Sequence, residues 1–248
     1  LALRAPGCAL GPEPVKETRG VPMKTELFEV QGLCVDVTYL VLGVLQNNTY
    51  IVSDGQGTMV VDPSCDADKI LTALDGATPD AIVVTHGHWD HFGAAAELRE
   101  ATGAPVVASV ADAPFIVEPL DKGMARKAVP CAVDRTVASG DVVEVGAMKW
   151  KVVETPGHSK GSICLFIVPQ FGNHPGGLPV LLSGDTLFAG TVGRTDFEGG
   201  SMVEMAASIK KLAALPDDTA VLPGHNSLTT IGAERRRVFT MFGDEPEE

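Results

Sequence analysis

The chain has 248 residues, of which 45% are hydrophobic and 21% charged, a composition typical of a globular protein with a buried core. Its formal net charge of -13 argues against nucleic acid and anionic membranes as partners, because both carry dense negative charge. The five cysteines are an odd number without a Cys-x-x-Cys pair, so we expect reduced thiols and a cytoplasmic location.

Both ends of the sequence lack the pattern of a folded core. Residues 1–22 are rich in Pro and Gly, show no periodicity and lack the apolar core of a signal peptide. Residues 244–248 belong to an acidic terminus. We therefore expect a disordered or non-native tail at the start, a single domain over 23–243 and a short acidic tail at the end.

Short β-type segments open the domain. Four apolar or alternating segments between Leu27 and Pro63 are separated by Gly, Asn and Asp, which predicts an antiparallel meander. The most apolar stretch, Val37–Leu45, is too short to cross a bilayer. The pattern then changes to βαβ order, with alternating helices and strands. These are a helix near Asp66–Leu74, a strand at 81–85, a helix near Gly93–Ala101 and a strand at 105–109.

The second half of the domain repeats this order. A β-rich run between Asp141 and Asp185 leads into a helix over Met202–Leu215, a strand at 219–224 and a last helix near Ile231–Phe242. Two halves that each pass from strands to helices predict two sheets packed together with the helices outside.

Three of the six histidines stand within six residues, directly after the apolar segment 81–85. Folds of the α/β class place ligand sites on the loops that leave such strands. His86 and His88 share one face of an extended chain, so both imidazoles can bind one metal ion. Asp90 and His91 point to a second position near the next helix. The alternative is a set of surface or capping residues, and Asp90 alone is compatible with a helix cap.

The other candidate ligands each follow an apolar strand and a turn that contains glycine: His158 in ETPGHS, Asp185 in LLSGD and His225 in VLPGH. Together these residues form two sets of three: His86, His88 and His158 for one ion, and Asp90, His91 and His225 for the other. Asp185 is expected to lie between the two ions. Sites of imidazole and carboxylate accept Zn, Fe or Mn, so we expect two divalent ions, with zinc as the first choice.

The motifs THGHWDH, TPGHS, SGDTLF and LPGH, in this order, resemble those of the metallo-β-lactamase superfamily. The resemblance runs from about Leu27 to Phe239. It implies an αββα four-layer sandwich of the α/β (α+β) class with the metals at the sheet edge. Asp62, in MVVDP, matches the first motif aspartate of the family, which implies that it supports the ligand loops by hydrogen bonds. A plain turn residue at the end of a strand is the alternative for Asp62.

Within the superfamily, the segments GDTLFAGTVGRTDFEGGS and TTIGAERR resemble the glyoxalase II-like group of small bacterial hydrolases. That resemblance implies a small-molecule thioester substrate such as a hydroxyacylglutathione. The longer enzymes of the group carry a C-terminal helical region that binds glutathione, for which this chain is too short, and Asp196 stands about where they place a pocket tyrosine. Arg194 either binds an anionic group of the substrate or forms a salt bridge with Asp196.

Two ions held close together can lower the pKa of a bridging water and provide a hydroxide that attacks the thioester carbonyl. The carboxylates of Asp90 and Asp185 are the expected catalytic groups beside that nucleophile. A persulfide dioxygenase is the alternative, because that group shares the fold and a GRTDF segment and uses one iron, which would lie on His86, His158 and Asp185 here. The ending LPGHNSLTTIGAERR resembles the hydrolases instead.

Three further residues are expected to have structural roles. Ser159 lies in GHSKG, which matches the Gly-x-Ser-x-Gly elbow of serine hydrolases, but that elbow requires a following helix and the next segment predicts a strand. Trp89 is expected to pack on the next helix rather than line the pocket mouth. His174 lies in a Pro- and Gly-rich turn and is expected to be solvated.

Overall fold

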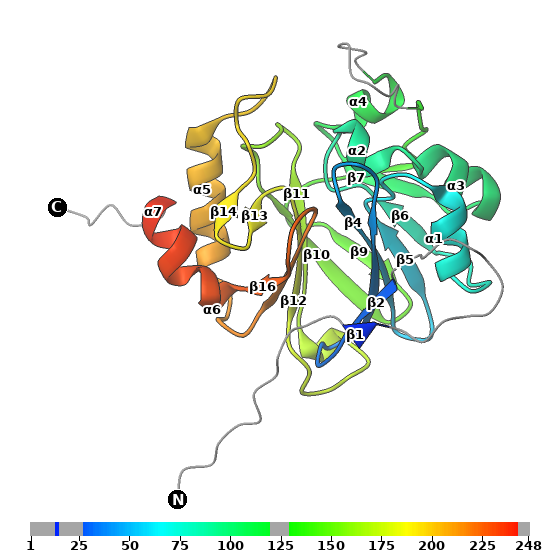
Figure 1. Cartoon of the computed structure of the whole chain (residues 1–248), viewed down its shortest axis with the longest axis horizontal. Helices are drawn as coiled ribbons and strands as arrows, with labels where there is room; N and C mark the ends of the chain where they lie inside the picture. Colours follow the sequence, from blue (N-terminus) through cyan, green and yellow to red (C-terminus); the bar gives the residue numbers. More distant parts are fainter. Residues whose placement is uncertain (1–12, 15–26, 120–128, 243–248) are drawn as a thin grey trace, which may run out of the picture.

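A computed structural model describes residues 13–14, 27–119 and 129–242 (Figure 1). Of the predicted N-terminal tail only Glu13–Pro14 lies within these residues, where it forms a short strand, and the predicted acidic tail lies outside them. Among the helices of the described ranges, none is long and apolar enough to cross a membrane.

The first sheet contains eight strands that follow one another in chain order. Strands β1 to β5 are antiparallel, as the predicted meander requires, and β5 to β8 are parallel. The strands are β1 (Glu13–Pro14), β2 (Leu27–Val30), β3 (Asp36–Leu42), β4 (Asn47–Ser53), β5 (Thr58–Val61), β6 (Ala81–Val83), β7 (Val106–Ser109) and β8 (Arg135–Val137).

The second sheet has the order β16-β15-β12-β11-β10-β9, and a separate hairpin, β13–β14, lies beside it. Only the pair of β12 and β15 is parallel. The strands are β9 (Val142–Val145), β10 (Met148–Glu154), β11 (Ile163–Ile167), β12 (Val180–Gly184), β13 (Leu187–Phe188), β14 (Thr191–Val192), β15 (Ala220–Pro223) and β16 (Thr229–Thr230).

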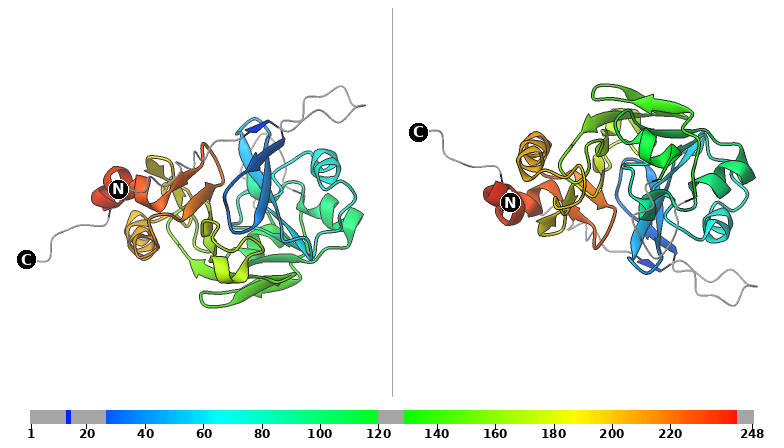
Figure 2. Two further views of the ribbon diagram at one scale, coloured as in Figure 1. Left: turned by 90° about the horizontal axis from the view of Figure 1, so that it is seen from below. Right: turned by 90° about the horizontal axis from the view of Figure 1, so that it is seen from above.

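The helices lie on the outer faces of the two sheets, as the views in Figure 2 show. Helices of the first half cover the first sheet, and those of the last 50 residues cover the second. They are α1 (Ala67–Ala73), α2 (Trp89–Phe92), α3 (Ala95–Thr102), α4 (Ala113–Val117), the 3-10 turn η1 (Pro169–Phe171), α5 (Met202–Ala213), α6 (Ile231–Glu234), the π-helical turn η2 (Arg235–Phe239) and α7 (Thr240–Phe242).

Three apolar clusters hold these four layers together. The largest cluster lies between the two sheets and contains Trp150 and Tyr50. A second cluster lies between the first sheet and its helices, and a third lies between the second sheet and its helices. Strand β10 alternates buried and exposed residues, because only one of its faces meets the core. Strands β6 and β7 are buried throughout, since helices and the second sheet cover both of their faces. The predicted αββα sandwich is confirmed.

The helix expected near Gly93–Ala101 is α3, and a short helix that was not expected, α2, precedes it. Helix α2 begins earlier, at Trp89, so Asp90 and His91 stand in a helical turn rather than in a loop. The chain then breaks at Gly93, where a Cβ atom would overlap the carbonyl oxygen of Ser64, and resumes as α3. Close approach of the segment at Ser64, which the local pattern does not encode, therefore requires glycine between α2 and α3.

The buried cysteine thiols fit the expectation of reduced cysteines. Cys34, Cys131 and Cys164 are buried. Burial raises the pKa of Cys34 and of Cys164 to about 11, despite hydrogen bonds that lower both values. These two thiols are therefore protonated and unreactive at neutral pH.

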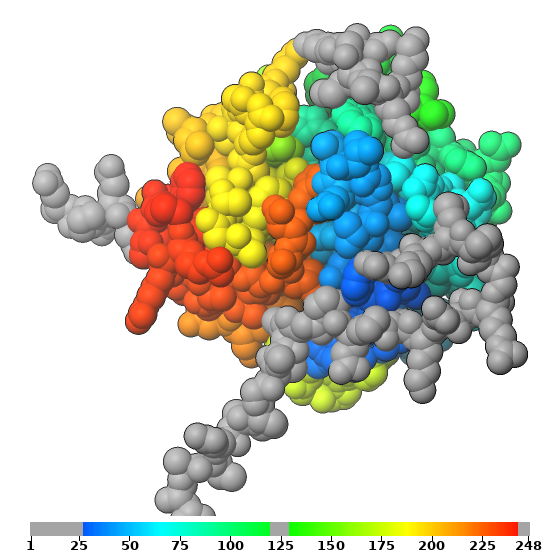
Figure 3. All heavy atoms as spheres, in the orientation of Figure 1, coloured from blue at the N-terminus to red at the C-terminus, as the bar shows by residue number. Residues whose placement is uncertain are grey.

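The two halves meet along one face of the molecule, where Figure 3 shows the blue and cyan segments beside the yellow to red ones. The β3–β4 turn reaches the second half there, because the carbonyl of Leu45 accepts a hydrogen bond from His225 Nδ1 at 3.0 Å. The loops that follow β6, β10, β12 and β15 carry the predicted ligands to this junction.

His174, predicted to be solvated, lies at the other end of β3. Its side chain is half exposed, and its Nε2 atom lies 2.7 Å from Oδ1 of Asp36, the residue that opens β3. It therefore does not line the junction.

Candidate metal centre

All seven predicted ligands converge at the junction of the two sheets. The loop after β6 supplies His86 and His88, helix α2 supplies Asp90 and His91, and the second sheet supplies the rest from the ends of β10, β12 and β15: His158, Asp185 and His225. Ligand atoms from these residues approach within 4.8 Å of one another in three overlapping groups of three.

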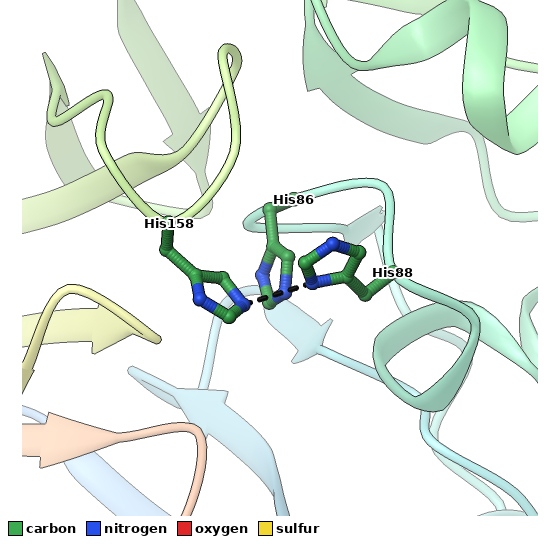
Figure 4. A group of neighbouring side chains, drawn as sticks. All are labelled: His86, His88 and His158. Carbon is green, nitrogen blue, oxygen red and sulfur yellow. Dashed lines mark hydrogen bonds between the residues drawn. The ribbon is translucent and has the colours of Figure 1, made fainter. Parts of the chain in front are cut away.

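The first group consists of His86, His88 and His158, whose rings point toward one another in Figure 4. His88 Nδ1 lies 2.8 Å from His158 Nε2. The ring of His86 lies 4.7 Å from that of His88 and 4.8 Å from that of His158, between centroids. Two loops from different halves of the chain therefore bring three imidazoles to one point.

The second group consists of Asp90, His91 and His225. Asp90 Oδ2 lies 3.4 Å from His225 Nε2 and 3.7 Å from His91 Nε2. The group therefore offers two imidazoles and one carboxylate, a donor set that suits a borderline divalent ion.

Asp185 lies between the two groups. Its Oδ1 atom is 3.4 Å from His91 Nε2, and its Oδ2 atom is 3.4 Å from His158 Nε2 and 3.5 Å from His225 Nε2. One carboxylate therefore faces imidazoles of both groups, as expected for a shared ligand.

Hydrogen bonds behind the rings fix which nitrogen of each histidine faces the centre. The Nδ1 atoms of four histidines have oxygen partners outside the centre at 2.7 to 3.2 Å. The partners are Thr85 Oγ1 for His86, Asp62 Oδ2 for His91, the Arg194 carbonyl for His158 and the Leu45 carbonyl for His225. In the neutral form of each of these rings, Nδ1 thus carries the proton and the Nε2 lone pair is directed inward.

Two buried atoms at the centre show that the side chains can accommodate a metal ion. His86 Nε2 and Asp185 Oδ1 have no hydrogen-bond partner among the residues that the structure describes. Buried polar atoms are rarely left without a partner, and these two are a lone pair and a carboxylate oxygen that face other ligand atoms. A cation at this position would satisfy both, so the side chains fit a metal centre.

The histidines of the first group are neutral at pH 7. Burial and the neighbouring imidazole of His158 lower the pKa of His88 to about 4. Burial, with the charge of His91, holds the pKa of His86 well below its ordinary range. Burial also lowers the pKa of His158, although Asp185 opposes this. These lone pairs are therefore available to a metal without loss of a proton.

The histidines of the second group have raised pKa values instead of lowered ones. Burial lowers the pKa of His91, but the carboxylates of Asp185, Asp62 and Asp90 outweigh it and raise that pKa well above its ordinary range. The pKa of His225 is also raised, because its hydrogen bond with Asp90 and the charge of Asp185 exceed the effect of burial. His91 is thus a cation among three carboxylates in the ion-free protein.

Asp62, which the resemblance implied as a support of the ligand loops, makes hydrogen bonds to both Thr85 and His91. It is buried, and its carboxylate accepts hydrogen bonds from the backbone and hydroxyl of Thr85 at 2.7 Å and from His91 Nδ1 at 2.9 Å. Its backbone has a left-handed φ of 51°, which is held in place by bonds to Val83 and Thr49. One side chain therefore orients ligands of both groups.

Sequence patterns did not point to Asn47, the first residue of β4. Its buried amide Nδ2 donates to Asp90 Oδ2 at 3.0 Å and lies 3.3 Å from His225 Nε2 and 3.4 Å from His91 Nε2. Asn47 thus contacts every ligand of the second group. The only local signal was an asparagine pair at the start of a strand.

The family profile described as metallo-β-lactamase superfamily matches residues 42–225, which include every candidate ligand. The chain belongs to the metallo-β-lactamase superfamily. Among curated members, the hydroxyacylglutathione hydrolase GloC of Haemophilus influenzae is 30% identical over 200 residues, covering 77% of this chain and 90% of that protein.

Solved structures of other superfamily members share the fold. A B3 metallo-β-lactamase, BLEG-1, superposes with a TM-score of 0.72 at 32% identity, over 82% of this chain and 98% of that one. TTHA1623 in a di-iron-bound form gives 0.69 at 36% identity, over 80% and 97%. ETHE1 from Myxococcus xanthus gives 0.62 at 31% identity, over 80% and 81%. The names of these relatives differ, so similarity of fold alone does not assign an activity to this chain.

Arg194 and Asp196, the expected substrate contacts of this superfamily member, form an ion pair with each other. Arg194 Nη2 lies 2.7 Å from Asp196 Oδ2, and both side chains are about two-thirds exposed, at 67% and 65%. The guanidinium carbon lies 4.4 Å from the centroid of the Phe197 ring, which itself packs against His88 and His158. Of the two alternatives for Arg194, the structure contains the salt bridge.

Ser159 and Trp89 have structural surroundings, as expected. The segment after Ser159 is strand β11, and the buried Ser159 hydroxyl donates to Asp112 Oδ2 at 2.6 Å. Trp89 packs against the cluster between the first sheet and its helices. Ser159 is therefore not arranged as the nucleophile of a serine hydrolase. Trp89 contributes to packing rather than lining a pocket.

Proposed function

We propose that this protein is a binuclear metallohydrolase that cleaves a thioester of a small thiol. The observation that carries the proposal is the pair of ligand groups that share Asp185. Support also comes from the two buried atoms that lack a partner within the described ranges and from the inward-facing imidazole nitrogens.

In this proposal His86, His88 and His158 would hold one ion, Asp90, His91 and His225 would hold the other, and Asp185 would be available to both. The chemistry that two bound divalent ions would supply is a hydroxide at neutral pH and polarisation of the substrate carbonyl. Asp90 and Asp185 then orient the nucleophile through their carboxylate oxygens. A thiolate leaves readily without protonation, so the absence of a separate general acid among the described central residues suits a thioester.

The thioester assignment rests on the relative named hydroxyacylglutathione hydrolase and on the motif segments around Arg194. The Arg194 guanidinium already pairs with Asp196, so an anionic thiol such as glutathione would compete with that carboxylate. We therefore infer that the substrate is a thioester of a small thiol.

Persulfide oxidation is the second candidate, since ETHE1 shares the fold at 31% identity. Its single iron would use His86, His158 and Asp185, and the last two lie 3.4 Å apart. Four predicted ligands would then have no role, and three of them favour the hydrolase, because Asp90, His91 and His225 form a complete second group with its own hydrogen bonds.

Metal content and a substrate panel test the proposal together. Protein purified without added metal should contain about two ions of Zn, Fe or Mn per chain by elemental analysis. It should release thiol from hydroxyacylglutathione or another acyl thioester, detected with a thiol reagent, faster than it opens a β-lactam. One iron per chain, with oxygen consumption on a persulfide substrate, would replace the proposal with the second candidate.

Replacing Asp196 with alanine should change substrate preference without loss of turnover. The substitution frees the Arg194 guanidinium, so kcat/KM for an anionic thioester should rise about two- to fivefold relative to a neutral one, the range typical of an exposed ion pair. Steady-state rates on the two substrates give this ratio. Asp217→Ala, which breaks the exposed ion pair with Arg235, is the matched control and should leave the ratio unchanged. An unchanged ratio in Asp196→Ala would place Arg194 outside the substrate path.

A further inference from the structure

Asp112 is a buried carboxylate that lies immediately before α4 and is 1% exposed. No described lysine or arginine forms an ion pair with it, so hydrogen-bond donors must compensate its charge. Three such donors surround it: the Gly87 amide at 2.8 Å, the Gly161 amide at 2.8 Å and the Ser159 hydroxyl at 2.6 Å.

These donors come from the two loops that carry the first ligand group. Gly87 lies between His86 and His88, and Ser159 follows His158 directly. The two loops are about 70 residues apart in sequence and leave different sheets. One carboxylate therefore connects the ligands of the first half of the chain with the ligand of the second.

The backbone is shaped to let this carboxylate approach. A Cβ atom on Gly161 would overlap the Ser109 hydroxyl, and one on Gly87 would lie 3.1 Å from Phe115 Cβ. Ser109 Oγ in turn accepts a hydrogen bond from the Asp112 amide at 3.1 Å, which ties the carboxylate to the end of β7. The carboxylate is thus held from its own side as well as from both loops.

From this geometry we propose that Asp112 is a positioning residue for the first metal site, which sets the distance between His158 and the two histidines of the other loop. The proposal rests on the binuclear function inferred above. The second group does not use this connection, because Asp62 and Asn47 support it from β5 and β4. Loss of Asp112 should therefore weaken one ion selectively.

Asparagine at this position keeps the shape but cannot keep all the bonds. One carboxylate oxygen accepts from Gly87 and Ser159, and the other accepts from Gly161. An asparagine NH2 group must replace one of these oxygens and would then face a backbone N–H, which cannot accept. At least one loop loses its connection in either orientation of the amide.

The test measures Zn²⁺ affinity by competition with a chromophoric chelator, on chelator-stripped protein reloaded with zinc. Wild-type protein should bind two ions, and Asp112→Asn should weaken one of them about 10- to 100-fold, as is typical for residues that orient metal ligands, and leave the other unchanged. In a His88→Ala background, Asp112→Asn should have no further effect on the remaining ion. Asp134→Asn is the matched control, because that aspartate also accepts a backbone N–H in the same half.

Equal weakening of both ions, or of neither, would overturn the proposal. Ser159→Ala, which removes one donor and keeps the carboxylate, should weaken the same ion by a smaller factor and serves if Asp112→Asn does not fold. If wild-type protein binds a single ion, the binuclear function fails. In that case the positioning role of Asp112 requires that Asp112→Asn lowers the Zn²⁺ affinity of this single site.

Discussion

Replacing Asp185 with alanine should reduce kcat by more than about 10³-fold, because no other carboxylate of the described residues faces both ligand groups. Changes behind the ligands typically cost 10- to 100-fold, and loss of a shared ligand should exceed that range. Burial raises the pKa of Asp185, but the charge of His91 outweighs it and keeps that pKa below its ordinary value, so the group is a carboxylate at neutral pH.

The variant should still fold, which separates a catalytic loss from a structural one. Asp185 Oδ1 has no hydrogen-bond partner within the described residues, so the substitution breaks no hydrogen bond at that atom. The measurement pairs kcat on the best thioester with the thermal unfolding temperature and metal content of each variant. His88→Ala, which removes a ligand of the first group only, should lose turnover as well. Wild-type rates in either variant would contradict the metal-centre assignment.

The metal centre could be predicted because its residues are marked in the sequence itself. His158 and His225 each follow an apolar strand and a glycine turn, and the stretch from His86 to His91 is dense in imidazole. The edge of a sheet gathers such positions, and the structure places all of them together. Their role as ligands stays a prediction until ions are measured.

The supporting residues could not be predicted, because their partners are distant in sequence. Asn47 reaches Asp90 across 43 residues and His225 across 178, and Asp112 reaches Ser159 across 47. An isolated asparagine or aspartate beside a strand or helix has many ordinary roles, such as turns and caps. Only the approach of β4 and α4 to the junction gives these side chains their function.

Short elements were missed for a different reason. Strands β13, β14 and β16 have two residues each, too few to show alternation. Helix α4 has five residues and begins with Ala113 and Pro114, so it has no apolar period to detect. These pieces form through contacts with longer elements, whereas the long strands carry their own pattern.

The two metal sites should respond differently to pH. His91 has a raised pKa and holds a second ring proton at neutral pH, whereas His86, His88 and His158 have lowered pKa values and are neutral, with one ring proton each. An ion that binds the second group must displace the His91 proton, and an ion that binds the first group displaces nothing. Zinc affinity of the second group should thus rise about tenfold per pH unit for each proton displaced.

The raised pKa of His91 and the lowered pKa of His88 decide how zinc affinity changes with pH at each site. Below the raised pKa of His91, protons compete with the ion, so the second site weakens as pH falls through the neutral range. Above that pKa the zinc affinity of the second site no longer changes with pH. The first site stays level down to about pH 5, since the pKa of His88 is about 4 and protons begin to compete only below that range. Acidification should therefore empty the second site first and leave a single-ion protein.

Zinc titrations between pH 6 and 8, with calorimetry in two buffers of different ionisation enthalpy, measure the protons released by each ion. We expect one ion without release and one with about one proton, plus a fraction from His225. Asp62→Asn removes one of the carboxylates that raise the pKa of His91, so it should reduce the pH slope of the second ion. Equal slopes for both ions would mean that His91 is neutral in the ion-free protein, and that the carboxylates around it do not set its charge.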